Sequence, residues 1–92
     1  MAPSRDSQKT IAATQLTAGR TYRVMKEFTD YDGLVHEVGD TWKYVSHNFL
    51  PYDDGLTLYV ERDGQSHVFR LQWRNETQGH IVSFFSDYVT EV

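Results

Sequence analysis

The sequence contains no cysteine, no long apolar run and no excess of basic side chains, and each absence excludes a class of protein. Without cysteine the chain can form neither a disulfide framework nor a cysteine-based zinc or iron–sulfur site. No stretch approaches the roughly 18 consecutive apolar residues of a membrane span. The formal net charge of −4 disfavours binding to nucleic acid or to an anionic membrane surface. We therefore expect neither nucleic acid nor a membrane as a partner.

The first residues also lack the apolar segment of a secretion signal, so a cytoplasmic location is expected. Residues 1–15 are small and polar and show no hydrophobic period, which predicts a disordered N-terminal tail. Residues 16–92 are then predicted to form one small β-rich domain. Aromatic residues make up 14% of the chain, and large rings allow such a domain to build a core from few side chains.

Within residues 16–92, short runs rich in β-branched and aromatic residues alternate with glycine-containing clusters typical of turns. The alternation predicts strands over residues 21–29, 41–45, 56–62 and 67–73. The dipeptide Asp63-Gly64 indicates a two-residue type I′ hairpin turn. Closing that turn places Leu58 opposite Phe69, so the turn and the apolar pattern select the same register.

Two readings of the C-terminal segment, residues 76–89, stay open. Asn75 as an N-cap and the helical spacing of the apolar side chains favour a short helix. Gly79 and the β-branched Ile81 are weak helix formers, which leaves a short strand followed by a turn as the alternative. The predicted core is Tyr22, Val24, Trp42, Leu56, Leu58, Phe69, Leu71, Trp73, Ile81 and Phe85.

Three short segments resemble parts of a Src-homology-3 (SH3) barrel, and they occur in the same order. These are residues 28–31, 38–42 and 86–89, which are similar to its long first loop, its diverging turn and a late tyrosine-containing turn. The tryptophan pair and the proline that line the polyproline groove of that family have no counterpart here. We predict a mainly β fold: a small SH3-like, partly open barrel of four to five antiparallel strands with a short C-terminal helix or turn.

A second resemblance covers nearly the whole domain. The segments at residues 19–31, 33–36, 48–55 and 70–74 are similar to a bacterial family known as domain of unknown function 3601. This resemblance implies a bacterial origin. It supplies no established activity and no catalytic residues.

The most unusual stretch is residues 48–55, where aromatic, proline and paired acidic residues share one connecting segment. It predicts either an exposed recognition loop or a loop that folds its own aromatic side chains onto the core. Tyr31 lies in a similar turn, and Arg70 and Arg74 share the outward face of a predicted strand, where they could clamp an anion or simply be solvated. The candidate binding residues are Tyr31, Phe49, Tyr52, Asp53, Asp54, Arg70, Arg74 and Tyr88.

The four histidines show neither the spacing of a metal site nor that of a catalytic motif, so no metal, cofactor or enzyme activity is expected. The first hypothesis is therefore a protein-interaction or accessory module with an aromatic and acidic loop surface. Its expected partner is a protein, and a strand edge offers a route to a homodimer. One alternative is a small ligand-binding protein or enzyme with a cleft near Tyr31 and Tyr52. Another is an acidic inhibitor or regulator of a basic partner.

Overall fold

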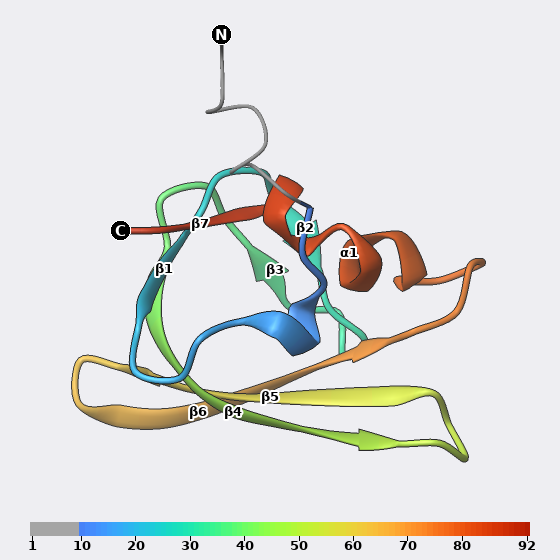
Figure 1. Ribbon diagram of the computed structural model, residues 1–92. Coiled ribbons are helices and arrows are strands. Elements are labelled where there is room, and N and C mark those ends of the chain that lie inside the picture. The colour runs from blue at the N-terminus through green and yellow to red at the C-terminus, as the bar shows by residue number, and fades with distance from the viewer. Residues whose placement is uncertain (1–9) are drawn as a thin grey trace, which may run out of the picture.

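The computed structural model describes residues 10–92, and a five-stranded antiparallel sheet dominates it (Figure 1). Its strands lie in the order β6-β5-β4-β1-β7, and two further short strands, β2 and β3, pair only with each other. The strands are β1 (Thr21–Val24), β2 (Phe28–Thr29), β3 (Val35–His36), β4 (Thr41–Leu50), β5 (Gly55–Arg62), β6 (Gln65–Gln72) and β7 (Val89–Glu91). The helical turns are η2 (Ala13–Gln15), α1 (Gly79–Ser83) and η3 (Phe85–Asp87).

The predicted β5–β6 hairpin forms in the predicted register. Leu58 pairs with Phe69 and Arg62 pairs with Gln65, so the apolar side chains of both strands share one face. Asp63 and Gly64 both have positive φ, at 53° and 79°, as a type I′ turn requires. The chain reverses at an aspartate and a glycine, two residue types that tolerate a positive φ.

The core lies between the sheet and the α1–η3 segment. Eight of the ten predicted core residues are buried, and Ile81 is half-buried against them. Trp73 corrects the prediction, because its side chain is 37% exposed. It follows the apolar alternation of β6 but lies after that strand ends at Gln72, where the two-residue period no longer fixes which way a side chain points.

The mainly β fold with a short C-terminal helix is confirmed. Across residues 10–92 the sheet stays open and does not close into a barrel. In the C-terminal segment the structure has the short helix and not the alternative strand: α1 and η3 occupy residues 79–83 and 85–87, and the strand β7 begins only at Val89. No helix within residues 10–92 has the length and apolar character needed to cross a bilayer.

The ordered fold begins earlier than the sequence predicted. Ala13 lies in η2 and is fully buried, and the backbone N–H of Ser86 donates to the carbonyl oxygen of Ile11. Residues 10–15 are therefore part of the domain and not of a tail, because a small buried side chain and a long-range backbone bond tie them to η3. Residues 1–9 of the predicted tail lie outside the described residues.

The β4–β6 ribbon extends beyond the core. β1 pairs with β4 only over Thr41–Lys43, and a β-bulge lies between Tyr44 and Ser46. Past the bulge, residues 45–50 of β4 are all exposed, whereas the partner strand β5 still buries Leu56 and Leu58. In Figure 1 this ribbon runs across the bottom of the molecule and its tip projects sideways. The tip carries residues 48–55, the segment in which aromatic, proline and paired acidic residues occur together.

Candidate binding cleft

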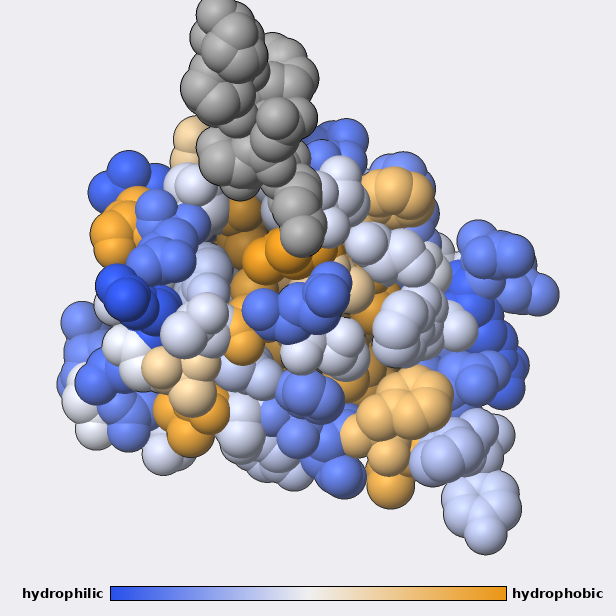
Figure 2. Space-filling view, in the orientation of Figure 1, coloured by the Kyte–Doolittle hydropathy of each residue, from blue (hydrophilic) through white to orange (hydrophobic). Residues whose placement is uncertain are grey.

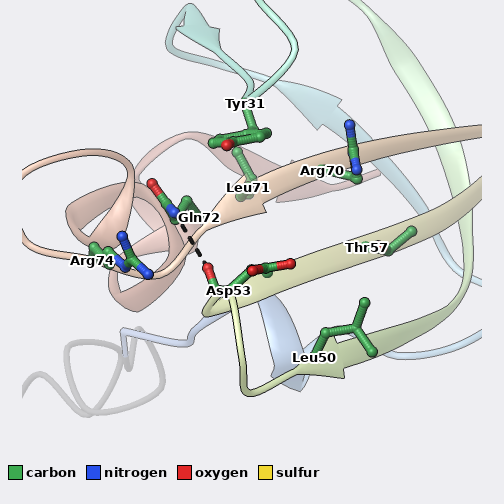
Figure 3. A pocket seen from close by; sticks show the side chains of 9 residues that line it. Tyr31, Leu50, Asp53, Thr57, Arg70, Leu71, Gln72 and Arg74 are labelled. Atoms are coloured by element: carbon green, nitrogen blue, oxygen red, sulfur yellow. Dashed lines mark hydrogen bonds between the residues drawn. The ribbon is translucent and has the colours of Figure 1, made fainter.

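An open cleft of about 410 Å³ lies between the β2–β3 turn and the end of the β4–β6 ribbon (Figure 3). Four of the predicted site residues meet here, from segments that are far apart in the sequence. The lining residues are Tyr31, Leu50, Asp53, Gly55, Thr57, Arg70, Leu71, Gln72 and Arg74. The cleft is built on the surface of the ribbon and not inside the core.

The β2–β3 turn is held by a buried carboxylate. Asp30 is 3% exposed, and its Oδ1 accepts the backbone N–H groups of Asp32 at 2.9 Å and Leu34 at 3.0 Å. Its Oδ2 accepts a hydrogen bond from Nε2 of His36 at 2.9 Å. The His36 ring stacks on Phe28 with ring centres 4.5 Å apart. These contacts fix the turn that presents Tyr31 to the cleft.

The sequence pattern assigned no role to His36 and missed this arrangement. Its side chain is 3% exposed and pairs with a carboxylate six residues earlier. The signal was present in the segment Asp30-Tyr31-Asp32-Gly33, because aspartate at the first position of a turn commonly accepts the backbone N–H two residues later. The pairing with His36 also requires the short β2–β3 ladder, which the sequence did not predict.

The same turn is attached to β6 by three contacts. The backbone N–H of Tyr31 donates to the carbonyl oxygen of Arg70 at 2.7 Å. The Arg70 guanidinium donates to both carboxylate oxygens of Asp32, at 3.1 Å from Nε and 2.5 Å from Nη2. It also lies over the Tyr31 ring, 5.7 Å from its centre. The hydrogen bond between Arg70 and Asp32 lowers the pKa of the carboxyl group and raises the pKa of the guanidinium.

The other wall of the cleft is the β4–β5 turn. Asp54 adopts a positive φ of 52°, and its carbonyl oxygen accepts the backbone N–H of Trp73 at 2.7 Å. Its carboxylate accepts a hydrogen bond from Nε of Arg74 at 2.8 Å, which raises the pKa of Arg74. Both cleft arginines are therefore already bonded to carboxylates of the neighbouring turns.

Asp53 differs from its neighbour Asp54. Its carbonyl oxygen accepts a hydrogen bond from Nε2 of Gln72 at 3.2 Å, and its side chain points into the cleft (Figure 3). Among residues 10–92 its carboxylate takes part in no ion pair. Asp53 is thus a carboxylate of the cleft without a salt bridge in the described part of the chain, and it acts on Arg74 only through a longer-range electrostatic attraction.

The remaining predicted site residues lie elsewhere. Tyr52 is 94% exposed at the tip of the ribbon, and Phe49 contacts Trp73 edge to face with ring centres 6.0 Å apart. Tyr88 is 7% exposed, and its ring packs edge to face on Phe28. Tyr88 is therefore a core residue, which corrects its assignment to a binding surface; η3 turns the chain so that this side chain points inward.

The aspartates of the turns do not form one continuous acidic surface. Asp30 is buried, Asp32 and Asp54 are paired with arginines, and Asp87 lies in η3 beside a different hollow. Within the described part of the chain, no group of three or more histidine, aspartate or glutamate side chains could hold a metal ion. The cleft therefore combines the Asp53 carboxylate, which forms no salt bridge within residues 10–92, with the exposed side chains of Tyr31 and Leu50.

Residues 8–92 match a family described as domain of unknown function DUF3601. The chain belongs to this family. The DUF3601 domain is also similar to a solved structure from the mobile metagenome of Vibrio cholerae, the integron cassette protein VCH_CASS4. The two are 31% identical with a TM-score of 0.83, over 96% of this chain and 97% of that chain. No curated protein is a match.

Proposed function

We propose that this DUF3601 domain is a protein-interaction module whose cleft accepts a lysine or arginine side chain of a partner protein. The observation that carries the proposal is the Asp53 carboxylate, which faces the cleft while the two cleft arginines are already paired. A cation is the chemical group that such a site attracts.

The charges around the cleft support a basic partner. Arg70 is paired with Asp32, and Arg74 with Asp54, so each of these pairs is close to neutral. Asp53 then leaves the cleft negative, and the net charge of −4 draws cations toward the whole molecule. An ion pair at about 4 Å is worth roughly 1 kcal/mol in water and about 4 kcal/mol near a protein surface before desolvation is counted.

The walls fit the rest of such a side chain. The Tyr31 ring and Leu50 offer exposed apolar surface to an aliphatic stem, and the side chains of Thr57 and Gln72 offer hydrogen-bonding groups beside it. Lysine and arginine commonly lay their methylene groups on apolar surface while the charged end reaches a polar group. The turn that carries Tyr31 is held in advance by Asp30, which reduces the entropy lost on binding.

The surface beside the cleft favours a protein as the partner. On the face drawn in Figure 2, apolar side chains reach the surface near the tip of the ribbon, where Phe49, Leu50 and Trp73 are exposed. Tyr52 projects from the same tip and is almost completely exposed. Exposed aromatic residues next to a pocket are typical anchors of protein interfaces.

A small cationic molecule is the second candidate, because the cleft volume lies at the lower end of the range of ligand sites, about 300–1,000 Å³. Replacing Tyr52 by alanine separates the two. A protein partner that covers the tip loses affinity when this ring is removed, whereas a molecule held inside the cleft does not contact it. In both cases we propose that the cleft binds its ligand and catalyses no reaction, because the other ionised groups that surround it are bonded to each other.

The decisive test is selection of peptides from a random displayed library against the full chain. We expect the selected peptides to share a lysine or arginine, and Asp53→Asn to weaken their binding about fivefold, or roughly 1 kcal/mol. Asp63→Asn is the matched control, because it removes the same charge from the distant β5–β6 turn. Peptides without a basic residue, or equal losses in both variants, would refute the proposal.

A further inference from the structure

The outer edge of β4 is open beyond residue 44. On this side, the backbone N–H of Tyr44 donates to the carbonyl oxygen of Arg20 at 2.9 Å, and its own carbonyl accepts the N–H of Gly19 at 2.8 Å. No further strand within residues 10–92 continues that pairing along residues 45–50, although β5 pairs with their other side. β4 is therefore an interior strand in its first half and an edge strand in its second half.

The pairing pattern shows which backbone groups face outward. A two-residue turn makes Arg62 and Gln65 a hydrogen-bonded pair, and bonded and non-bonded pairs then alternate along the sheet. This alternation turns the N–H and C=O groups of His47 and Phe49 away from β5. The same rule places the Arg70 carbonyl on the outer side of β6, where it does accept the Tyr31 N–H.

This edge lacks the devices that usually block strand pairing. Residues 45–50 are Val-Ser-His-Asn-Phe-Leu, with no charged side chain and no proline, and all are exposed. Exposed sheet edges in natural proteins usually carry lysine, proline or a covering loop. The bulge at Val45 only bends the strand where it leaves β1.

The other edge of the ribbon, β6, is protected. The carbonyl of Arg70 is occupied by Tyr31, and the backbone N–H of Gln72 donates to Oε1 of Gln78 at 2.8 Å. The part of β6 that remains open, residues 65–69, is shorter than the open part of β4 and ends at residues that other segments already bind. The contrast makes β4, and not β6, the edge that is available to a partner.

We propose that a second copy of this chain pairs with this edge, antiparallel and β4 to β4, to form a two-fold symmetric dimer. This inference is independent of the cleft and its ligand. An axis at Asn48 sets His47 opposite Phe49 of the second copy, and the outward groups of both residues then form about four backbone hydrogen bonds. Val45 falls opposite Pro51, where pairing ends because proline has no N–H.

Self-complementarity is the reason to choose a second copy over another protein. Each copy carries a net charge of −4, which opposes association in general, but this strand brings no charged side chain to the pairing. Its central residue, Asn48, has an amide that can both donate and accept, so it can bond to its own symmetry mate across the axis. The apolar Val45, Phe49 and Leu50 lose solvent contact in the same step.

Size-exclusion chromatography with light scattering on the full chain tests the dimer, whose mass should be twice 10.7 kDa. His47→Pro removes one outward N–H and leaves the bonds to β5 intact, so we expect it to raise the dimer dissociation constant at least about tenfold. Val68→Pro is the matched control, because it removes an outward N–H from β6. His47→Ala removes the imidazole but keeps the N–H and should still dimerise.

A cross-link tests the register even if the proline variant does not fold. Asn48→Cys introduces the only cysteine of the chain, and directly opposed Cα atoms lie about 4.4–6.8 Å apart, as a disulfide requires. We expect this variant to form a covalent dimer under mild oxidation, whereas Thr57→Cys on the neighbouring strand should not. A monomer at all concentrations, a dimer that only Val68→Pro disrupts, or no cross-link at position 48 would each overturn the proposal.

Discussion

The buried carboxylate of Asp30 should be one of the largest single contributions to the stability of the domain. Replacing Asp30 with alanine removes the acceptor of two backbone N–H groups and the partner of the His36 ring. The two backbone donors belong to exposed residues and can reach water, so each loss costs about 1 kcal/mol. The His36 nitrogen is buried, and leaving it without a partner costs about 1–3 kcal/mol. We expect Asp30→Ala to lower the free energy of unfolding by about 3–5 kcal/mol.

Urea unfolding followed by far-ultraviolet circular dichroism measures this loss, and an unchanged m-value would show that both states keep their exposed surface. Asp30→Asn is the informative control. Its amide oxygen can accept the two backbone N–H groups, and its N–H can donate to His36 once that ring adopts the other tautomer. We expect the asparagine variant to lose about 1 kcal/mol. A cost below about 1 kcal/mol for alanine, or equal costs for both variants, would refute this account of the turn.

Three further predictions follow from single contacts. The Arg70 hydrogen bond lowers the pKa of Asp32 in the folded chain. The stabilisation from this pair is therefore fully present above the ordinary pKa of 3.8 and is lost as the pH falls through the lower folded-state pKa. The difference in unfolding free energy between the native chain and Asp32→Asn should disappear in that acid range. Gly79→Ala should lower the melting temperature, because an added Cβ would lie 2.6 Å from the carbonyl oxygen of Arg74; unchanged thermal unfolding would show that the backbone gives way there. Burial raises the pKa of Tyr44, so the unfolded chain ionises first and stability should fall as the pH rises above 10, and Tyr44→Phe should remove that part of the decline in alkaline unfolding curves.

The sequence predicts the β5–β6 hairpin well because the information is local. Asp63-Gly64 and the apolar alternation on both sides of it specify one register, which the structure shows. The two misplaced aromatic residues mark where local information ends. Trp73 continues the apolar alternation of β6 but lies after that strand has ended, and Tyr88 lies in a turn whose direction depends on η3.

The cleft could be predicted only in pieces. Asp53 and Arg70 were recognised as candidates, but each from its own segment. The β5–β6 ladder brings these two residues to one end of the ribbon, whereas Tyr31 reaches them only because the β2–β3 turn docks against β6 through an ion pair between Asp32 and Arg70, 38 residues apart. Nothing in the local pattern of either segment reports that contact, so the sequence could not show that the arginines are already neutralised.

The cleft and the open β4 edge have one structural origin. The buried side chains of β4 end at Tyr44, although its next residues pair with the part of β5 that carries the buried Leu56 and Leu58. The strand continues to Leu50, and this extension exposes Phe49, Leu50 and the Tyr52 tip to solvent, which carries a risk of aggregation. The proposed recognition roles give a reason for this extension, because the extra length supplies both a wall of the cleft and an unpaired strand edge.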